Sequence, residues 1–559
     1  MSQALRDLAG ALQQRTERAP DPMRAERSER LRRHVVDYLA PRAANLAAPL
    51  VVVLLGSTGA GKSSLFNAIA GKQLSESGLL RPTTRRPVAL VHPDDEPALH
   101  AGDLLQGLVS RDNLDLRSDA AAIAPGVVVV DAPDFDSVEI ANRELAMELL
   151  EASDLVVFVT TVTRYADQIP WTVLARVRQR GVPLLAVLNR MPPDSPEATA
   201  VIADFRALLD RAELDRLGAF GPLEIVTVPE GAIDAAIDGL DRSAIQPILA
   251  GIETLRSDQE KRRAVIRRSL DNALQGLPAA VEEVAAEVDE EQLAAAALRR
   301  ALETRFERAR KALTREIENG TFLRSEVLRM WLEFVNAGPL TRYISEGVGR
   351  VAASIRGIFR PATPAPATEV SEAAFSDLVA SVVHHVDTAA HQSSVDWSAD
   401  HFGANALATD PGLWGASEGA APRLDHQLDG WLVEIGEKIR VAGAERKGRA
   451  QAASISLNVL GTSAMLGVFL HTGGLTGAEL GIGAATAVIN QKLLEAVFGE
   501  ANVSKFVSEA SASLATILDE AFASEKRRFL EALGPLAEPT DLAERLRHAA
   551  HRAIRSVHE

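Results

Sequence analysis

The chain has 559 residues, of which 47% are hydrophobic, so it is long enough to bury a large core and to form two or more domains. Its formal net charge of −16 argues against nucleic acid as the main partner. Cysteine is absent, which excludes disulfides and thiolate metal sites and is typical of a reducing compartment. Residues 1–20 are charged throughout and lack the apolar core of a signal peptide. We therefore expect a cytoplasmic protein, either free or held at the inner face of the cell membrane.

Two regions of the chain carry helical patterns. Residues 1–47 are charged and amphipathic, and we expect them to pack with a helical bundle from a later part of the chain. Residues 241–559 are helical in pattern almost throughout, which predicts a large all-α stalk or bundle. Within this region the Pro- and Ala-rich stretch 360–368 is predicted to be a connector, and 455–489 is an apolar segment. The apolar positions of the N-terminal helices are Leu5, Leu8, Leu12, Leu31, Val35 and Leu39.

Residues 48–240 are predicted to form an α/β domain with a mostly parallel sheet. Short apolar runs rich in β-branched residues alternate there with helical stretches, as expected for strands that are buried on both faces. The fold class is therefore an α/β domain joined to a large all-α region. The predicted strands lie at 50–55, 127–130, 155–159, 184–188 and 223–228.

The first predicted strand leads directly into a phosphate-binding motif. Gly56, Gly61, Lys62 and Ser63 satisfy the spacing G-x-x-x-x-G-K-[ST], and a helical run follows at once. The glycines let backbone N–H groups turn toward a phosphate, and the start of the helix adds a partial positive charge. Lys62 is expected to contact the β- and γ-phosphates, and Ser63 is expected to bind Mg²⁺. The predicted nucleotide contacts of this loop are Gly56, Ser57, Thr58, Gly59, Ala60, Gly61, Lys62, Ser63 and Ser64.

Three later stretches carry candidate residues for the nucleotide and its metal ion. Thr84 lies in the loop 81–87, where a switch segment is expected, and it would complete Mg²⁺ coordination once a γ-phosphate is bound. Asp131 ends the strand at 127–130 and is expected to hold Mg²⁺ through water. Asn189 ends a later strand, where a base can be read. The order of the four motifs and their places at strand ends predict a nucleotide site.

The motif set resembles the dynamin-like and septin-related GTPases. The stretches G-S-T-G-A-G-K-S-S and T-R-R-P, a D-x-P strand end and an N-[KR] strand end follow one another over residues 50–190. The long helical remainder is similar to bacterial dynamin-like proteins. The resemblance implies a GTPase head that uses GTP with Mg²⁺, on a helical stalk that acts at membranes, often through self-association or pairing of GTPase domains. By position it assigns catalytic roles to Lys62 and Thr84, metal roles to Ser63, Thr84 and Asp131, and nucleotide contacts to Asn189 and Arg190.

Three positions depart from the pattern of the resembled family. Asp134 stands where the family has the glycine of D-x-P-G, and a carboxylate beside a phosphate is repulsive, so slow turnover is one expectation. Pro192 replaces the aspartate that pairs with guanine, with Asp194 two residues later, so ATP stays open beside GTP. Thr58 stands where dynamins have the glutamine that orients the attacking water. No general base is assigned, and no fifth motif is found up to Val228.

The apolar segment at 455–489 has two interpretations. No charged residue occurs between Arg449 and Glu479, a length comparable with the ~20 apolar residues of a membrane span. His471 and the glycines after it divide the segment into halves that each reach only ~24 Å, which favours a helical hairpin inserted into one leaflet. A basic stretch upstream is suited to anionic lipid headgroups. The alternative is the tight core of a soluble bundle, because the flanks lack the aromatic belt common at membrane interfaces.

The sequence therefore predicts GTP binding and hydrolysis coupled to a conformational change or to self-association of the helical region at a membrane. Two alternatives stay open: a soluble regulatory NTPase that binds a protein partner, and a scaffold that binds nucleotide for stability with negligible turnover. His384, Asp387 and His391 share a helix face, for which a solvated surface is favoured over a metal site.

Overall fold

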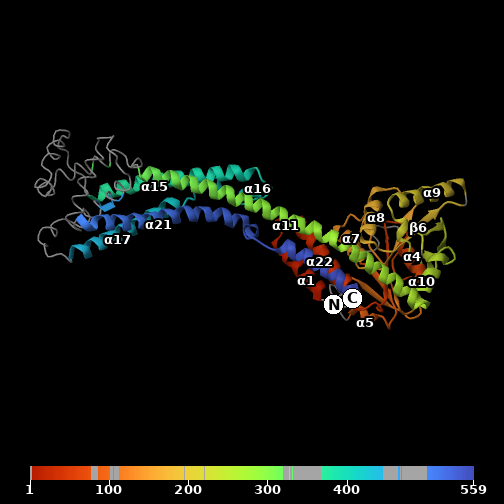
Figure 1. The fold of residues 1–559 in the computed structure, drawn as a ribbon. Coiled ribbons are helices and arrows are strands. Elements are labelled where there is room, and N and C mark those ends of the chain that lie inside the picture. Colours follow the sequence, from red (N-terminus) through yellow and green to blue (C-terminus); the bar gives the residue numbers. More distant parts are fainter. Residues whose placement is uncertain are drawn as a thin grey trace, which may run out of the picture. The chain divides into compact units, whose positions relative to one another are not determined.

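The computed structural model describes two compact units. Unit 1 comprises Met1–Glu290 and Thr540–Glu559, and unit 2 comprises Glu291–Pro539 (Figure 1). The boundary predicted at residue 240 differs from this division, because the first part of a long helix and the helix near the C-terminus both pack within unit 1. The residues that the structure describes are 3–76, 86–100, 105, 113–193, 195–219, 221–318, 327, 330, 367–444, 462, 464, 465, 468 and 500–558.

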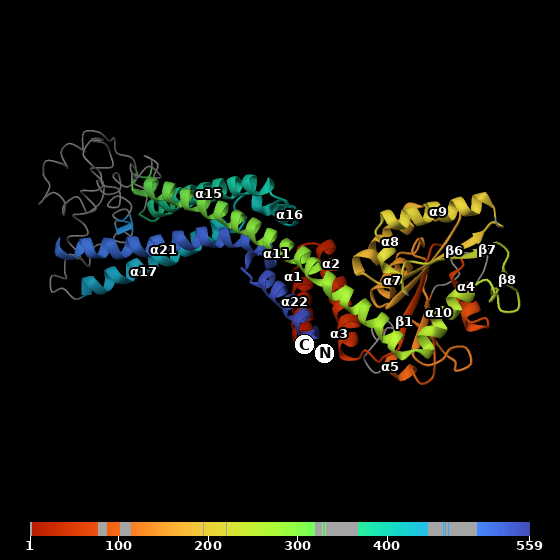
Figure 2. The same ribbon diagram turned by 45° about the vertical axis from the view of Figure 1, so that its right-hand side comes forward.

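Unit 1 is built on a seven-stranded sheet with the strand order β3-β2-β4-β1-β5-β6-β7. Figure 2 labels β1, β6 and β7 of this sheet. Neighbouring strands run parallel except β2 and β4, which are antiparallel, so the predicted mostly parallel sheet is confirmed. All five predicted strands are present, and β2 and β3 are strands that the apolar runs do not predict. The bounds are β1 (Leu50–Gly56), β2 (Val88–Val91), β3 (Asp115–Ser118), β4 (Val127–Asp131), β5 (Leu155–Thr161), β6 (Leu184–Met191) and β7 (Ile225–Pro229), with a separate hairpin of β8 (Ile233–Asp234) and β9 (Gly239–Leu240).

Helices cover both faces of this sheet, because successive residues of each strand point to opposite faces. In β1, Val52 and Leu54 pack toward α4, α10 and the start of α11. Val51 and Val53 pack toward α7, α8 and α9 on the other face. The bounds are α4 (Lys62–Ala70), α5 (Glu96–His100), α7 (Ile140–Glu151), α8 (Gln168–Arg180), α9 (Pro196–Arg211), η2 (Asp215–Leu217), α10 (Gln246–Ser257) and α11 (Gln259–Glu318).

A helical layer of unit 1 is formed by the two ends of the chain together with α11. The predicted apolar residues Leu5, Leu8 and Leu12 are fully buried against residues of α11 and α22. The polar residues Tyr38 and Arg42 both bind the carboxylate of Asp154, which precedes β5, and so fasten these helices to the sheet. The bounds are α1 (Gln3–Arg18), α2 (Pro22–His34), the π-helical turn η1 (Val35–Leu39), α3 (Ala40–Ala44) and α22 (Leu542–His558).

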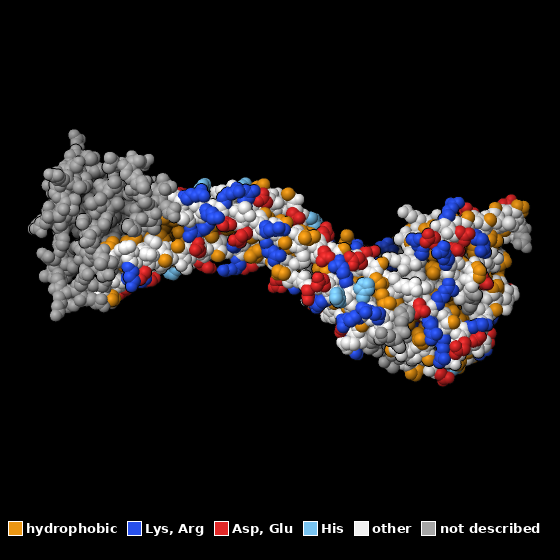
Figure 3. Space-filling model, viewed as in Figure 1, with side chains coloured by type: hydrophobic (Ala, Val, Ile, Leu, Met, Phe, Trp, Pro, Cys, Tyr) orange, Lys and Arg blue, Asp and Glu red, His pale blue; other side chains and the backbone are white. Residues whose placement is uncertain are grey.

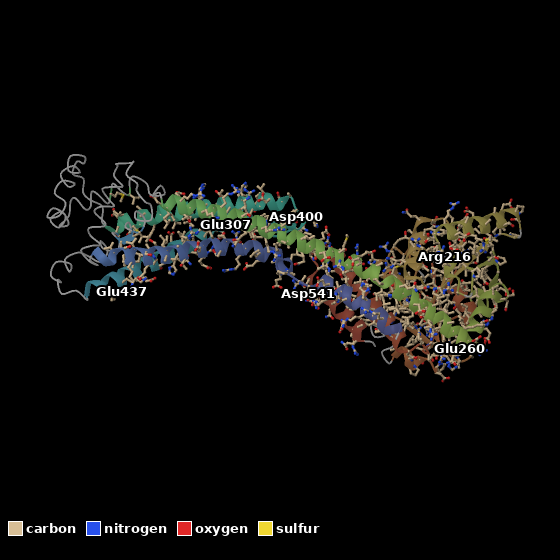
Figure 4. All side chains as sticks on the ribbon, in the orientation of Figure 1. Arg216, Glu260, Glu307, Asp400, Glu437 and Asp541 are labelled. Atoms are coloured by element: carbon tan, nitrogen blue, oxygen red, sulfur yellow. The ribbon has the colours of Figure 1, made fainter. Side chains whose placement is uncertain are left out.

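Unit 2 is a bundle of long amphipathic helices around one hydrophobic core, which includes Trp397, Phe306 and Phe529. On the face drawn in Figure 3, positive and negative side chains are interspersed over the described part of unit 2. Arg310 and Asp519 form one such ion pair of this unit. Figure 4 labels Asp400, whose carboxylate accepts two backbone N–H groups and caps α16. Beyond α11, the described elements are α15 (Ala367–Ser398), α16 (His401–Thr409), η3 (Pro411–Trp414), α17 (Ala420–Ala444), α21 (Glu500–Leu533) and η4 (Gly534–Ala537).

Two predicted features of unit 2 fall largely outside the described residues. Residues 360–366 of the predicted connector lie outside the described residues. Helix α15 begins at Ala367, one residue before the predicted end of the connector. In the apolar segment 455–489 only four residues are described, and all four are buried: Thr462, Ala464, Met465 and Val468. Among the described helices, none is long and apolar enough to cross a membrane.

The histidine-rich face of α15 makes contacts with the segment 414–416. Asp387 accepts the backbone N–H of Ala416 through Oδ1 at 3.0 Å, and the ring of His391 lies 5.7 Å from that of Trp414. Within the described ranges no group of three or more His, Cys, Asp or Glu side chains is arranged to hold a metal ion.

Candidate functional site: a phosphate loop between two strand ends

The loop between β1 and α4 is shaped by two glycines that no other residue could replace without displacing neighbours. A Cβ on Gly56 would lie 2.4 Å from the carbonyl oxygen of Val159 on the adjacent β5. Gly61 has φ +99°, and a Cβ there would lie 2.3 Å from Nδ2 of Asn189. The motif glycines therefore let the loop pass close to β5 and β6, and α4 begins at Lys62 with its N-terminus at the loop.

The ammonium group of Lys62 is held inside this loop. Its Nζ donates to the carbonyl oxygens of Gly56 at 2.9 Å and Ser57 at 3.4 Å, and to Oδ1 of Asp134. The Lys62 side chain is 4% exposed and that of Asp134 is 13% exposed. The position that departs from the family glycine thus contacts the predicted phosphate-binding lysine directly.

Asp131 lies at the end of β4, beside Leu54 of β1, and is fully buried. Its Oδ2 accepts the hydroxyl of Ser75 at 2.7 Å, and the Ser63 hydroxyl also binds the carboxylate. Burial raises the pKa of Asp131, against the opposing effects of Lys62 and of the two serine hydrogen bonds. Its Oδ1 is buried and has no hydrogen-bond partner among the described residues.

These residues fit a magnesium ion, because Mg²⁺ prefers oxygen ligands and usually retains several waters. A buried carboxylate oxygen without a partner and a neighbouring hydroxyl supply such ligands at the start of α4. Thr84, the third predicted metal ligand, lies outside the described residues.

Asp136, which follows Asp134 in the segment 131–136, also binds the phosphate loop. Oδ1 of Asp136 accepts the backbone N–H of Thr58 at 2.6 Å and its hydroxyl at 2.7 Å. Oδ2 of Asp136 accepts Nη1 of Arg164 at 2.9 Å, and the same nitrogen donates to the carbonyl of Thr58 at 3.1 Å. Although partial burial raises the pKa of Asp136, these hydrogen bonds and the Arg164 charge hold that pKa below its usual value. Thr58 therefore serves as a point of attachment between the loop and residues 131–136.

Asn189 lies at the end of β6 and reaches back to the phosphate loop. Its Nδ2 donates to the carbonyl of Ala60 at 2.8 Å, and its Oδ1 accepts the backbone N–H of Arg190 at 2.8 Å. Arg190 has φ +56°, and its exposed guanidinium donates to the carbonyl of Gly59 at 3.0 Å. The structure thus brings the predicted base-contacting residues to the predicted phosphate loop.

The remaining predicted positions lie near the loop and the strand ends or outside the described residues. Ser64 lies in the first turn of α4, and Pro192 follows the end of β6. Asp194 lies outside the described residues. Beyond Val228, where no fifth motif was found, the backbone N–H of Glu230 donates to the carbonyl of Met191 at 2.8 Å, so the end of β7 lies beside the end of β6.

Several residues of the site carry no motif of their own. Asn67 on α4 binds both backbone groups of Ser75, and so positions the hydroxyl that contacts Asp131. Asp136 and Arg164 form the attachment at Thr58. The one available signal was the third acidic residue of D-A-P-D-F-D, Asp136, which falls just beyond the predicted strand end.

A glycine loop follows β1, with a lysine at the start of α4, a buried aspartate at the end of β4 and an asparagine near the end of β6. This arrangement defines a P-loop nucleotide-hydrolase domain. Residues 51–190 match the family model described as 50S ribosome-binding GTPase. The protein is therefore a P-loop GTPase over this part of its chain, as the motifs predict.

Comparisons with whole proteins are more distant. Two solved structures of an oligomerised bacterial dynamin pair, described as a mechanism for long-range sensing and tethering of membranes, are each 12% identical to the chain. Each comparison covers 99% of this chain and 95% of the other, with TM-scores of 0.37 and 0.35. No curated protein matches the chain. The family match over residues 51–190 agrees with the GTPase part of the predicted resemblance.

Proposed function

We propose that unit 1 binds and hydrolyses GTP with Mg²⁺, and that this cycle changes the conformation of residues 131–136 and of the segment around Thr84. The observation that carries the proposal is the convergence of Lys62, with its ammonium inside the loop, and Asp131, with an unpartnered buried oxygen. Lys62 would bind the β- and γ-phosphates, while Ser63 and Asp131 would hold the metal ion. The metal ion supplies charge neutralisation on the phosphate oxygens when it is bound.

The proposal is tested by phosphate release from GTP and from ATP, measured side by side with Mg²⁺ and with EDTA. We expect turnover that needs Mg²⁺ and that falls about a hundredfold or more in Lys62→Ala, because the lysine stabilises phosphate charge. Lys72→Ala is the matched control, since that lysine is half-exposed and pairs with Asp119 outside the loop. A Lys62→Ala variant that binds and hydrolyses nucleotide like the parent would contradict the proposal.

The same assay tests the base that the site selects. We propose guanine, which is supported by the position of Asn189 beside the loop and by the GTPase family match. Pro192 has no carboxylate with which to pair guanine N1 and N2, so faster turnover of ATP would show that guanine selection has been lost. A large thermal stabilisation by GTP without phosphate release would instead favour the nucleotide-stabilised scaffold.

We propose that the helical region responds to this cycle by a change in conformation or self-association, at the inner face of a membrane. The proposal of membrane contact is supported by the uncharged stretch between Arg449 and Glu479 and by the basic residues before it. Flotation with anionic and with neutral liposomes, each with GTP and with GDP, tests it. We expect binding to anionic vesicles, and phosphate release that increases on them. Protein that stays with the buffer in every condition would contradict membrane contact.

A soluble regulatory NTPase is the second candidate, and one observation favours it. Ala464, Met465 and Val468 are fully or almost fully buried in the hydrophobic core of unit 2. These residues would be unavailable to lipid unless the bundle opened. Turnover that is indifferent to liposomes, together with failure to float, would favour this candidate and a protein partner.

A further inference from the structure

The phosphate-binding lysine already has an anionic partner inside the protein. An ammonium group has three N–H donors and no acceptor. Lys62 directs its donors to the carbonyls of Gly56 and Ser57 and to the carboxylate of Asp134. No donor is left over for an incoming phosphate.

A phosphate that enters the loop must therefore replace one of these acceptors. The carbonyls of Gly56 and Ser57 belong to the backbone of the loop, so they cannot leave without unfolding it. The Asp134 carboxylate is on a flexible side chain, and it would be repelled by a phosphate that approached the same ammonium group. Asp134 is thus the acceptor that gives way.

We propose that Asp134 is an internal competitor of the nucleotide phosphate: its carboxylate occupies Lys62 when no nucleotide is bound and is expelled when the phosphate arrives. This inference rests on the proposed function of the loop, and it adds a residue that sets nucleotide affinity. The binding-competent fraction of the protein is the fraction in which Asp134 has left Lys62. The apparent dissociation constant rises as this fraction falls.

Movement of the Asp134 side chain away from Lys62 would also affect the residues next to it in the chain. Phe135 is buried and stacks on Phe158, with ring centroids 6.1 Å apart, so it holds the middle of the segment in place. The backbone N–H of Ser137 donates to the carbonyl of Asp134, which closes a turn after it. The structure thus assigns the change to the Asp134 side chain and this turn, rather than to the end of β4.

Asp136 offers a matched control within the same segment. It carries the same charge two residues away, but its oxygens bind Thr58 and Arg164 and not Lys62. A general effect of negative charge near the loop would act through both aspartates. Competition for the ammonium group would act through Asp134 alone.

The test is calorimetric titration of the full chain with GDP and with GTP in the presence of Mg²⁺, for the parent, Asp134→Asn, Asp134→Gly, Asp136→Asn and Lys62→Ala. We expect both Asp134 variants to bind each nucleotide at least about tenfold more tightly, which corresponds to a competent fraction of one tenth or less in the parent. We expect no tightening in Asp136→Asn. In hydrogen exchange without nucleotide, peptides that cover residues 131–137 should exchange faster in Asp134→Gly than in the parent.

The inference is overturned if the Asp134 variants bind no more tightly than the parent, or if Asp136→Asn gives the same gain. Weaker binding by Asp134→Asn would mean that the carboxylate helps to hold the nucleotide or its metal ion, which also overturns competition. These outcomes are separate from failure of the proposed function, because that failure appears as unchanged binding and hydrolysis in Lys62→Ala.

Discussion

Acidification is expected to destabilise unit 1 through His34, the last residue of α2. Its side chain is 9% exposed, its ring stacks on Tyr38, and Nδ1 lies 3.2 Å from Oε2 of Glu151. Burial, together with the charge of Arg180, lowers the pKa of His34 to about 4 against the opposing effect of Glu151. The charged groups that act on it are Glu151 on α7 and Arg176 and Arg180 on α8.

The sign and size of the effect follow from proton linkage. The unfolded chain has a histidine pKa near 6.5, so as the pH falls the unfolded state takes up a proton before the folded state does. The contribution of His34 to stability is therefore complete above pH 6.5 and is lost as the pH falls to about 4. The free energy of unfolding should fall by about 1.4 kcal/mol per pH unit in this window, or about 3 kcal/mol in all.

The assay is urea unfolding of unit 1 at a series of pH values, for the parent and for His34→Gln. The chain has no cysteine, so a dye on one introduced cysteine, Ile169→Cys at a half-exposed position of α8, reports on unit 1 alone. Taking the difference in the free energy of unfolding between parent and variant removes the contribution of the carboxylates, because they titrate in both proteins. A difference that stays constant between pH 7 and pH 4, or that grows in favour of the parent, would refute the reasoning. A constant difference would show that folding does not shift the pKa of His34, and a difference that grows in favour of the parent as the pH falls would show that Glu151 favours its protonated form.

Three further substitutions test the packing and the loop. Asp154→Ala leaves the guanidinium of Arg42 buried without its carboxylate, and we expect unit 1 to lose about 3–5 kcal/mol in urea unfolding. Trp397→Ala removes a fully buried ring from the core of unit 2 and should cost about 3–5 kcal/mol, measured by calorimetric unfolding. Gly61→Ala adds about 1–3 kcal/mol of backbone strain and a clash with Asn189, so nucleotide affinity should fall at least about tenfold in titration. Unchanged stability or affinity in any of the three would contradict the contact concerned.

The central strands of the sheet could be predicted because their patterns are local. A run such as 127–130, with four valines, has few structures open to it other than a strand buried on both faces. β3 could not be predicted in this way, because Asp115–Ser118 is a polar, partly exposed strand at the edge of the sheet. Its pairing with β2 depends on tertiary context rather than on its own residues.

The residues of the candidate site also fall into those with a local sequence pattern, which could be predicted, and those without one. Lys62 and Asn189 belong to motifs whose spacing follows from the geometry of a loop and of a strand end, so the sequence located them. Ser75 and Arg164 bind residues that are distant in the sequence, and neither has a recurring pattern around it. From the sequence we expected only that Asp134 would repel a bound phosphate. The contact between Asp134 and Lys62 was not predicted, because the spacing of the motifs does not reveal which charged side chains pair.

The boundaries of the units were the least predictable feature. Helical periodicity indicates which face of a helix is apolar, but it does not indicate which other helix covers that face. The apolar face of α22, which includes Leu542 and Leu546, is covered by α1 and α11 in unit 1. The sequence pattern alone assigns this helix to the preceding bundle equally well.

The pairing of α1 with α22 has a consequence for synthesis of the protein. Arg545 binds Gln14 and Arg552 binds Asp7, so a helix that is translated before unit 2 is matched with one that is translated after it. All of unit 2, residues 291–539, is translated between the two parts of unit 1. At ordinary elongation rates this takes about ten to fifty seconds, during which the leucine face of α1 lacks the part of its cover that α22 supplies. We therefore expect nascent chains to need protection of that face, and the sheet to mature before the helical layer beside it is complete.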